Sequence, residues 1–310
     1  MINRILIRIK VVQMLYSYIM TNDGATVAKF KRELEKSLDK SHELYHWLLQ
    51  LMIDMTDYQD LRLDENKHKF LPSQEDLNPN MRFVNNQFIA ALRDNQELKQ
   101  MVKDCNIAWR DDEIFLRLML DKVLNSEYYE RYMSMEKTDF ESDCEVWSQL
   151  MKQVILVDGD LLEFLESKSV YWGFDDVEVM GQFALKTIRK FEKKARNPMS
   201  PKFKDDDDRD FGMRLFTKTI DERVENNKLI DEAARSGRWE SDRLATMDRI
   251  IMCAALTEIQ NFDSIPVNVT LNEYIEMAKN YSTPRSGQFI NGILNTIVKQ
   301  LRANGSVTKP

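Results

Sequence analysis

Apolar residues recur at helical spacing along most of the chain. In the first twenty residues the three- and four-residue steps of one helix face are followed by Ile5, Ile9, Val12, Leu15, Tyr16 and Ile19. The same spacing continues over residues 26–64, 82–104, 111–135, 140–168, 175–196, 210–234 and 241–261. Apolar and polar residues do not alternate over any useful length, so strands are not expected. The pattern predicts an all-α fold.

The last two predicted helices carry local start signals. Thr270 and Glu273 have the spacing of a capping box, in which each side chain bonds a free backbone N–H of the first turn. Thr283 precedes Pro284, and proline is favoured at the first position of a helix because its missing N–H costs nothing there. We therefore predict one helix beginning near Thr270 and another near Thr283.

Three stretches interrupt the helical pattern. Asn22–Gly24 is a turn signal, and Pro72–Asn80 is polar and begins with proline. Pro198, Pro201 and the acidic run Asp205–Asp208 predict a second, solvated linker. A metal site at four adjacent aspartates beside two prolines is disfavoured.

The C-terminal motifs resemble those of a known family. Asn272-Glu273-x-x-Glu276-x-Ala278-Lys279, followed by Phe289-x-Asn291-Gly292-x-Leu294, is similar to the C-terminal signature of the NusB family of bacterial transcription antitermination factors. Asp248–Met252, Thr257–Ile259 and Ile265-Pro266 resemble the preceding helix and loop of that family. Arg8-x-x-Val11-Val12-Gln13-x-Leu15-Tyr16-Ser17 resembles its first helix. The resemblance implies a NusB-like helical bundle with an additional inserted helical region.

This resemblance suggests a division of the chain into three parts. We expect N-terminal NusB-like helices at 1–65, an acidic helical insertion at 66–205 and a C-terminal NusB-like RNA-binding domain at 206–310. The net charge is −7, with +4 in residues 1–40 and +1 in residues 241–310, which leaves −12 for residues 41–240. Because phosphate binding needs local positive charge, the mildly basic ends permit RNA binding. The acidic middle is expected to lie away from RNA, as a protein-binding or stabilising element.

Residues that match family positions give the candidate site. The resemblance implies RNA contacts by Arg4, Arg8, Lys10, Gln13, Tyr16, Arg285, Gln288 and Phe289. Asp248 and Arg249 match positions near the surface that receives the protein partner. Two other interpretations stay open at this point. The two arginines near the N-terminus also fit a solvated helix edge, and both aromatic residues fit a core stripe.

The function implied by the resemblance is binding without catalysis. Family members bind the boxA element, a single-stranded RNA in ribosomal RNA leader transcripts, together with the NusE ribosomal protein. The complex then acts on the RNA polymerase elongation complex so that terminators are ignored. We accordingly expect no catalytic residue, cofactor or metal. An alternative within the same domain type is an RNA-binding module of an rRNA-modifying complex.

A second alternative comes from His42-Glu43-Leu44-Tyr45-His46, which is a literal H-E-x-x-H motif. On a helix, the two histidines share one face and can ligate zinc, with Glu43 as general base of a hydrolase. A third ligand is needed, and Glu65 or His68 is the candidate. The competing interpretation is two exposed histidines beside a buried stripe of Leu44, Trp47 and Leu48.

Composition indicates a cytoplasmic protein. Cys105, Cys144 and Cys253 are few, distant and odd in number, which argues for a reducing compartment. The apolar start of the chain is interrupted by Arg8 and Lys10, so a secretory signal is not expected. No segment is apolar enough to suggest a membrane partner.

Overall fold

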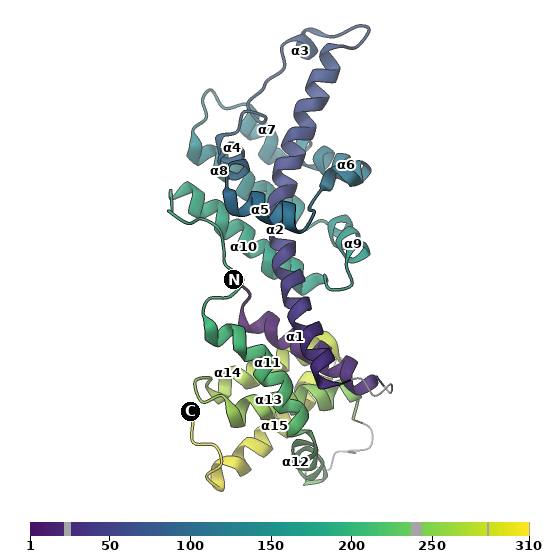
Figure 1. Ribbon diagram of the computed structural model, residues 1–310, viewed down its shortest axis with the longest axis vertical. Helices are drawn as coiled ribbons and strands as arrows, with labels where there is room; N and C mark the ends of the chain where they lie inside the picture. Colours follow the sequence, from purple (N-terminus) through teal and green to yellow (C-terminus); the bar gives the residue numbers. More distant parts are fainter. Residues whose placement is uncertain (22–25, 237–243, 284, 310) are drawn as a thin grey trace. The chain divides into compact units, whose positions relative to one another are not determined.

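The computed structural model describes residues 1–21, 26–236, 244–283 and 285–309, and every regular element in these ranges is helical (Figure 1). The predicted all-α fold is confirmed. The predicted turn at Asn22–Gly24 and the predicted helix position of Pro284 lie outside the described residues. None of the helices in the described ranges is both long and apolar enough to cross a membrane.

The chain contacts divide it into two compact units. Unit 1 comprises Met1–Ile2 and Asp39–Lys202, and unit 2 comprises Asn3–Leu38 and Phe203–Pro310. The helices with residues in unit 2 are α1 (Arg4–Met20), the start of α2 (Val27–Lys67), α11 (Asp206–Asp221), α12 (Arg223–Ser236), α13 (Thr246–Asn261), α14 (Val267–Tyr281) and α15 (Ser286–Ala303). The boundary inside α2 falls between Leu38 and Asp39. The partition at 65 and 205 stays a prediction.

Unit 2 is organised around α13. This helix contacts α1, α11, α12, α14 and α15, and every residue from Ile250 to Ile259 is buried. A helix that is buried on all sides must be apolar all round, and Ile250–Leu256 supplies that composition. Polar side chains within α13 therefore have to find partners inside the unit.

Two glycines allow close helix contacts in unit 2. A Cβ atom at Gly212 of α11 would lie 2.8 Å from the Cγ2 atom of Ile7 on α1. A Cβ atom at Gly287 of α15 would lie 2.8 Å from the Cγ atom of Lys279 on α14. Both separations are shorter than normal van der Waals contact, so a side chain at Gly212 would displace buried Ile7, whereas one at Gly287 would first displace the exposed side chain of Lys279.

Unit 1 is built around the rest of α2. Its other elements are α3 (Gln74–Leu77), α4 (Gln87–Arg93), α5 (Gln96–Asp104), the 3₁₀ helix η1 (Trp109–Asp112), α6 (Glu113–Leu124), α7 (Glu127–Met133), α8 (Phe140–Leu150), the π-helix η2 (Met151–Ile155), α9 (Gly159–Lys168) and α10 (Phe174–Glu192). The indole ring of Trp47 on α2 makes edge contacts with Trp109 and Trp172, with centroid distances of 5.1 and 5.8 Å. Tyr45 reaches α10, where its hydroxyl lies 2.7 Å from the hydroxyl of Thr187.

Several predicted helices are broken by caps. The stretch 82–104 forms α4 and α5 because the side chain of Asn95 accepts from the N–H of Leu98 and starts a new helix. Ser126 does the same for α7 by accepting from the N–H of Tyr129. The stretch 210–234 is divided at Glu222 into α11 and α12. Apolar periodicity continues through each break, so it did not reveal them.

Two local predictions are wrong. Asp205–Asp208 is not a linker, because Asp205 caps α11 and the next three aspartates form its first turn, where the helix dipole favours negative charge. Thr270 and Glu273 do not form a capping box, because α14 already begins at Val267 after Pro266. Thr270 is instead buried, and its hydroxyl donates to Glu258.

Candidate functional site

The N-terminal half of α1 carries three cations, of which Arg8 and Lys10 are buried and Arg4 is half-buried. Asn3 caps the helix by accepting from the N–H of Leu6. Arg4 donates from Nε to Asp208 over 2.7 Å, and its guanidinium lies 5.1 Å from the ring centroid of Phe211. Arg4 keeps 29% of its side chain exposed. It is therefore the one of the predicted N-terminal cations that retains solvent contact.

Arg8 belongs to a buried polar network. It is 3% exposed and donates from Nε and Nη2 to the two carboxylate oxygens of Glu258, each over 2.8 Å. The same carboxylate accepts from the hydroxyls of Thr270 at 2.7 Å and Tyr274 at 3.2 Å. Burial acts to lower the pKa of Arg8, but its hydrogen bonds and the charge of Glu258 outweigh this and raise the pKa. Burial, followed by the charge of Glu258, raises the pKa of Tyr274.

Burial corrects the expectation for two of the predicted RNA contacts. Arg8 and Lys10 are each 3% exposed, so neither presents its charge to RNA in this structure. Every residue of α1 from Leu6 to Val12 is buried, so this part of the helix is enclosed on all sides. Glu258, the partner of Arg8, is too distant in sequence for any local pattern to indicate the pairing.

Other predicted residues gather around the N-terminal half of α13. Leu15 and Ile19 of α1 line one cavity together with Arg249 and Ile250 of α13. Asp248 of α13 accepts from the hydroxyl of Ser286, the first residue of α15, over 3.1 Å. The end of α1 and the beginning of α15 therefore both lie beside the beginning of α13.

We use the name α13 face for the polar and aromatic side chains carried by the segments of α1, α13 and α15 near the start of α13. It comprises Gln13, Tyr16, Arg249, Arg285, Gln288 and Phe289. Gln13, Tyr16, Arg285 and Gln288 are exposed, and Phe289 is half-buried. Tyr16 has 39% of its surface exposed, which is high for a large aromatic residue in a folded helix. Asp248 is only 5% exposed and accepts a hydrogen bond from Ser286 at the start of α15. It therefore has little surface to offer a protein partner.

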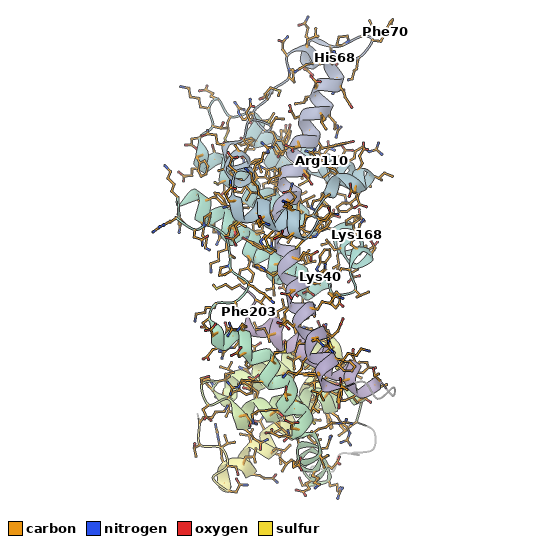
Figure 2. All side chains as sticks on the ribbon, viewed as in Figure 1. Lys40, His68, Phe70, Arg110, Lys168 and Phe203 are labelled. Atoms are coloured by element: carbon orange, nitrogen blue, oxygen red, sulfur yellow. The ribbon has the colours of Figure 1, made fainter. Side chains whose placement is uncertain are left out.

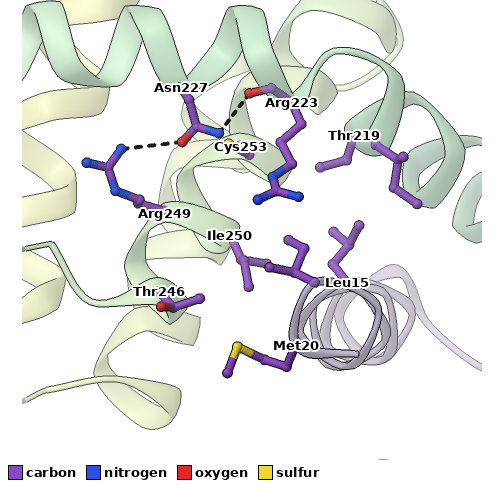
Figure 3. Close-up of a pocket in the computed structure, with 11 residues that line it drawn as sticks. Leu15, Met20, Thr219, Arg223, Asn227, Thr246, Arg249, Ile250 and Cys253 are labelled. Atoms are coloured by element: carbon purple, nitrogen blue, oxygen red, sulfur yellow. Dashed lines mark hydrogen bonds between the residues drawn. The ribbon is translucent and has the colours of Figure 1, made fainter. Parts of the chain in front are cut away.

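Arg249 lies at the edge of the α13 face. Its Nη2 atom is 2.9 Å from Asp231 Oδ1, and its Nη1 atom donates to Asn227 Oδ1 over 3.4 Å. The cavity beside it has a volume of about 270 Å³ and an apolar lining that includes Leu15, Met20 and Cys253 (Figure 3). Arg223 also lines this cavity (Figure 3), and sequence analysis did not identify it because it follows an unpredicted helix break.

Arg4 is distant from the α13 face along α1. Twelve residues separate it from Tyr16, which corresponds to about 18 Å at 1.5 Å per residue. The predicted RNA-binding residues are therefore divided between the two ends of α1. Gln13 and Tyr16 lie toward the C-terminal end of α1, where Leu15 and Ile19 line the cavity beside the start of α13.

The H-E-x-x-H motif lies in unit 1 and is mostly buried. His46 is fully buried, which corrects the expectation of two exposed histidines. Its Nδ1–H donates to the carbonyl of His42 over 3.0 Å, and its Nε2 has no partner among the described residues. Burial lowers the pKa of both histidines to about 4.

The third zinc ligand proposed from sequence is out of reach. Glu65 and His68 follow His46 by 19 and 22 residues; Glu65 lies on the same helix and His68 one residue past its end, so they lie roughly 30 Å away. Figure 2 shows His68 near the far end of α2, next to Phe70. Among the described residues no group of three His, Cys, Asp or Glu side chains is placed to hold a metal ion.

Sequence comparison relates part of this chain to one known family. The NusB family matches residues 173–299. A transcription antitermination protein NusB of Salinibacter ruber is 38% identical over 109 residues, which cover 35% of this chain and 67% of that protein. Counterparts of the same name in Bacillus thuringiensis strain Al Hakam and Bacillus anthracis strain CDC 684 are each 43% identical over 76 residues. These residues cover 24% of this chain and 58% of either Bacillus protein.

No solved structure matches the chain. The family match nevertheless spans α10 to α14 and most of α15, and so includes α13, the helix around which unit 2 is organised. The part with NusB character is thus the C-terminal part of an all-helical protein. On this evidence the chain belongs to the NusB family.

Proposed function

We propose that the protein is an RNA-binding transcription antitermination factor that acts on ribosomal RNA operons. It binds boxA-type single-stranded RNA together with the NusE ribosomal protein and acts on the RNA polymerase elongation complex in the cytoplasm. Family membership supports the general role. The observation that carries the proposal for this chain is the α13 face, where exposed Tyr16, Arg285 and Gln288 accompany half-buried Phe289.

The chemistry of the α13 face suits unstacked bases. An aromatic ring that stacks on a base contributes ~1–3 kcal/mol and tolerates different bases. Arg285 lies at the N-terminal end of α15, where free N–H groups and the helix dipole also favour a phosphate. Gln288 adds a side chain that can both donate to and accept from base edges.

The proposed roles follow from burial. Gln13, Tyr16, Arg285, Gln288 and Phe289 contact RNA, and Arg4 contributes one phosphate contact at the other end of α1. Arg8 and Lys10 hold α1 in place instead of contacting RNA, because both are buried. Arg249 and the adjoining cavity receive the protein partner, while Asp248 supports the start of α15.

The proposed mechanism needs no chemical step. Phosphate contacts position the RNA, and contacts with unstacked bases select it. The partner protein extends the surface that the RNA covers. The protein thus acts by assembling a complex and not as an enzyme.

The experiment is a gel shift with a labelled boxA RNA and a scrambled RNA of equal length, with and without NusE. We expect boxA to be preferred, and NusE to strengthen its binding. Phe289→Ala should weaken boxA binding by ~1–3 kcal/mol, because one stacking contact is lost. The matched control is Tyr18→Ala, since Tyr18 is also half-buried but packs edge-on against Phe30 at 5.3 Å.

The two variants should have opposite effects on stability and RNA affinity. Tyr18→Ala should lower stability and leave RNA affinity nearly unchanged, whereas Phe289→Ala should do the reverse. If Phe289→Ala lowers the melting temperature while boxA affinity stays at the wild-type level, the ring belongs to the core and the α13 face does not bind bases.

A further inference from the structure

One short segment at the C-terminal end of unit 1 is strongly basic. Residues 186–202 contain seven Lys or Arg residues and one acidic residue, Glu192, in a chain whose net charge is −7. The acidic total of the middle of the chain therefore conceals a strongly basic surface. It lies on the C-terminal half of α10 and the turn that follows (Figure 1).

Five of these cations are exposed within eleven residues of one another in sequence, and we call them the α10 stripe. Its members are Lys186, Arg189, Lys193, Lys194 and Arg196. Lys186, Arg189 and Lys193 stand at positions i, i+3 and i+7, so they share one helix face. The opposite face of α10 is buried and includes Ala184, Leu185 and Ile188.

The end of α10 is held in a defined conformation. The N–H of Lys194 bonds the carbonyl of Phe191, and the N–H of Ala195 bonds the carbonyl of Lys190, which is the Schellman arrangement. Lys194 occupies the left-handed region with φ of 53°. A residue with a side chain costs roughly 1 kcal/mol there, where glycine would cost nothing. Lys194 thus stands at a position where glycine would be more stable.

The stripe lacks acidic partners. None of its five side chains makes an ion pair or hydrogen bond within the described residues, although other cations of unit 1 do. Arg62 pairs with Asp121 at 2.6 Å and Lys168 with Asp112 at 2.7 Å. Local repulsion is visible nearby: burial, followed by the charge of Lys186, lowers the pKa of Lys190.

Helix stability alone does not account for the stripe. Cations near a helix C-terminus gain ~0.3–1 kcal/mol each from the dipole, and the effect fades within the last turn. Lys194 and Arg196 lie beyond the last residue of α10, and Lys186 lies well before its last turn. Five unpaired like charges in one group also repel one another. A bound polyanionic ligand would neutralise these charges and so remove the repulsion among them.

We propose that the α10 stripe is a second RNA-binding surface, which contacts the phosphate backbone of single-stranded RNA independently of its sequence. This inference rests on the proposed function, because that function supplies the RNA. It replaces our expectation that the acidic middle of the chain avoids RNA. The stripe presents no exposed aromatic side chain, since Phe191 packs edge-on against Phe88 at 5.6 Å. Phosphate contact without base stacking is therefore the interaction available to it.

The stripe does not suit a membrane surface. A helix that lies in a bilayer interface inserts an apolar face, and the apolar face of α10 is already buried in unit 1. The one large exposed apolar residue of α10, Phe174, stands at its N-terminal end. The observations thus favour RNA over a lipid surface.

The test compares two full-length variants with the same change in charge. In the stripe variant, glutamine replaces Lys186, Arg189, Lys193, Lys194 and Arg196. In the control variant, glutamine replaces three lysines and two arginines that are also exposed in unit 1, namely Lys103, Arg117, Arg131, Lys137 and Lys152. Circular dichroism and thermal unfolding establish that both variants are folded.

The readout is the affinity for a fluorescein-labelled single-stranded RNA of about 30 nucleotides, measured across a salt series. Each phosphate contact contributes about 0.7 to the slope of log affinity against log salt for a single strand. We expect the stripe variant to lose a slope of about 2–3.5 and at least tenfold in affinity at low salt, equally for boxA and scrambled sequences. The control variant should keep the wild-type slope within about 0.7.

The outcomes separate this inference from the proposed function. Equal slopes for the stripe and control variants overturn the inference, whereas an effect of Phe289→Ala in the same assay leaves the α13 face standing. A stripe effect limited to boxA also overturns it, because phosphate contacts do not read sequence. Binding of the wild type to phosphatidylserine vesicles, with no slope change on RNA, would assign the stripe to membranes instead. A stripe effect without any effect of Phe289→Ala would retain the stripe and remove the α13 face.

Discussion

Arg8 shows how one ion pair can set the role of a residue. Its guanidinium donates from Nε and Nη2 to both carboxylate oxygens of Glu258, and the two side chains are 4% and 0% exposed. Removing one partner of a buried pair leaves the other charge without compensation, which typically costs about 3–5 kcal/mol. Arg8→Ala should therefore lower the free energy of unfolding by that amount in urea titrations. RNA affinity of the remaining folded protein should stay at the wild-type level.

Two further variants distinguish this explanation from a general loss of packing. Arg4→Ala should cost no more than about 1 kcal/mol, because the pair of Arg4 with Asp208 is partly exposed. Arg8→Met combined with Glu258→Gln should be more stable than Arg8→Ala alone, since the uncompensated charge is then absent. A double variant as unstable as Arg8→Ala would contradict the electrostatic explanation.

At the scale of elements, α2 contains a pH-sensitive pair of histidines. Burial lowers the pKa of His42 and His46 to about 4, from an ordinary value of 6.5. Between pH 6.5 and 4 the unfolded chain therefore binds more protons than the folded chain, and stability falls as the pH decreases. Above pH 6.5 this contribution is constant. The urea midpoint should accordingly drop between pH 7 and pH 4.5.

His46→Phe provides the control for this pH effect. His46 is fully buried and its Nε2 has no partner among the described residues. An apolar ring of similar size therefore removes the titrating group and loses only the hydrogen bond from Nδ1 to the carbonyl of His42. The drop in urea midpoint should then become smaller, because only His42 still titrates. An unchanged drop would mean that carboxylates, and not these histidines, cause the acid sensitivity.

The elements also show what periodicity can predict. The apolar repeats over 26–64 and 175–196 correspond closely to α2 and α10, because a long apolar repeat at helical spacing fits a helix and no other regular structure. The breaks at Asn95 and Ser126 were missed, since a cap interrupts hydrogen bonding without interrupting apolar spacing. The inward direction of Arg8 was missed for a different reason. Its partner is 250 residues away in sequence, and burial is decided by tertiary contact.

The candidate site was predictable only as far as local motifs reach. Tyr16, Arg285 and Gln288 were identified from the resemblance and are exposed as a binding role requires. Arg223 and the cavity that it lines depend on α1, α12 and α13 meeting, which no single segment encodes. The α10 stripe was visible in the sequence, but averaging the charge of a long segment concealed it.

At the scale of the whole molecule, the two units predict separable stability. Unit 2 has its own core around α13, formed by α1, α11, α12, α14 and α15. We therefore expect Asn3–Leu38 joined to Phe203–Pro310 to fold without unit 1. A Gly/Ser linker of about twelve residues has a root-mean-square span of ~19 Å and should impose little strain. Urea unfolding of this shortened chain should show one cooperative transition.

RNA binding by the shortened chain separates the contributions of the two units. It retains the α13 face, so boxA should still be preferred over a scrambled RNA. It lacks the α10 stripe, so the salt slope should be smaller than that of the full chain by about 2–3.5, as in the stripe variant. Adding the stripe substitutions to the full chain should reproduce most of this loss. A shortened chain that folds but shows no boxA preference would mean that sequence recognition requires residues of unit 1.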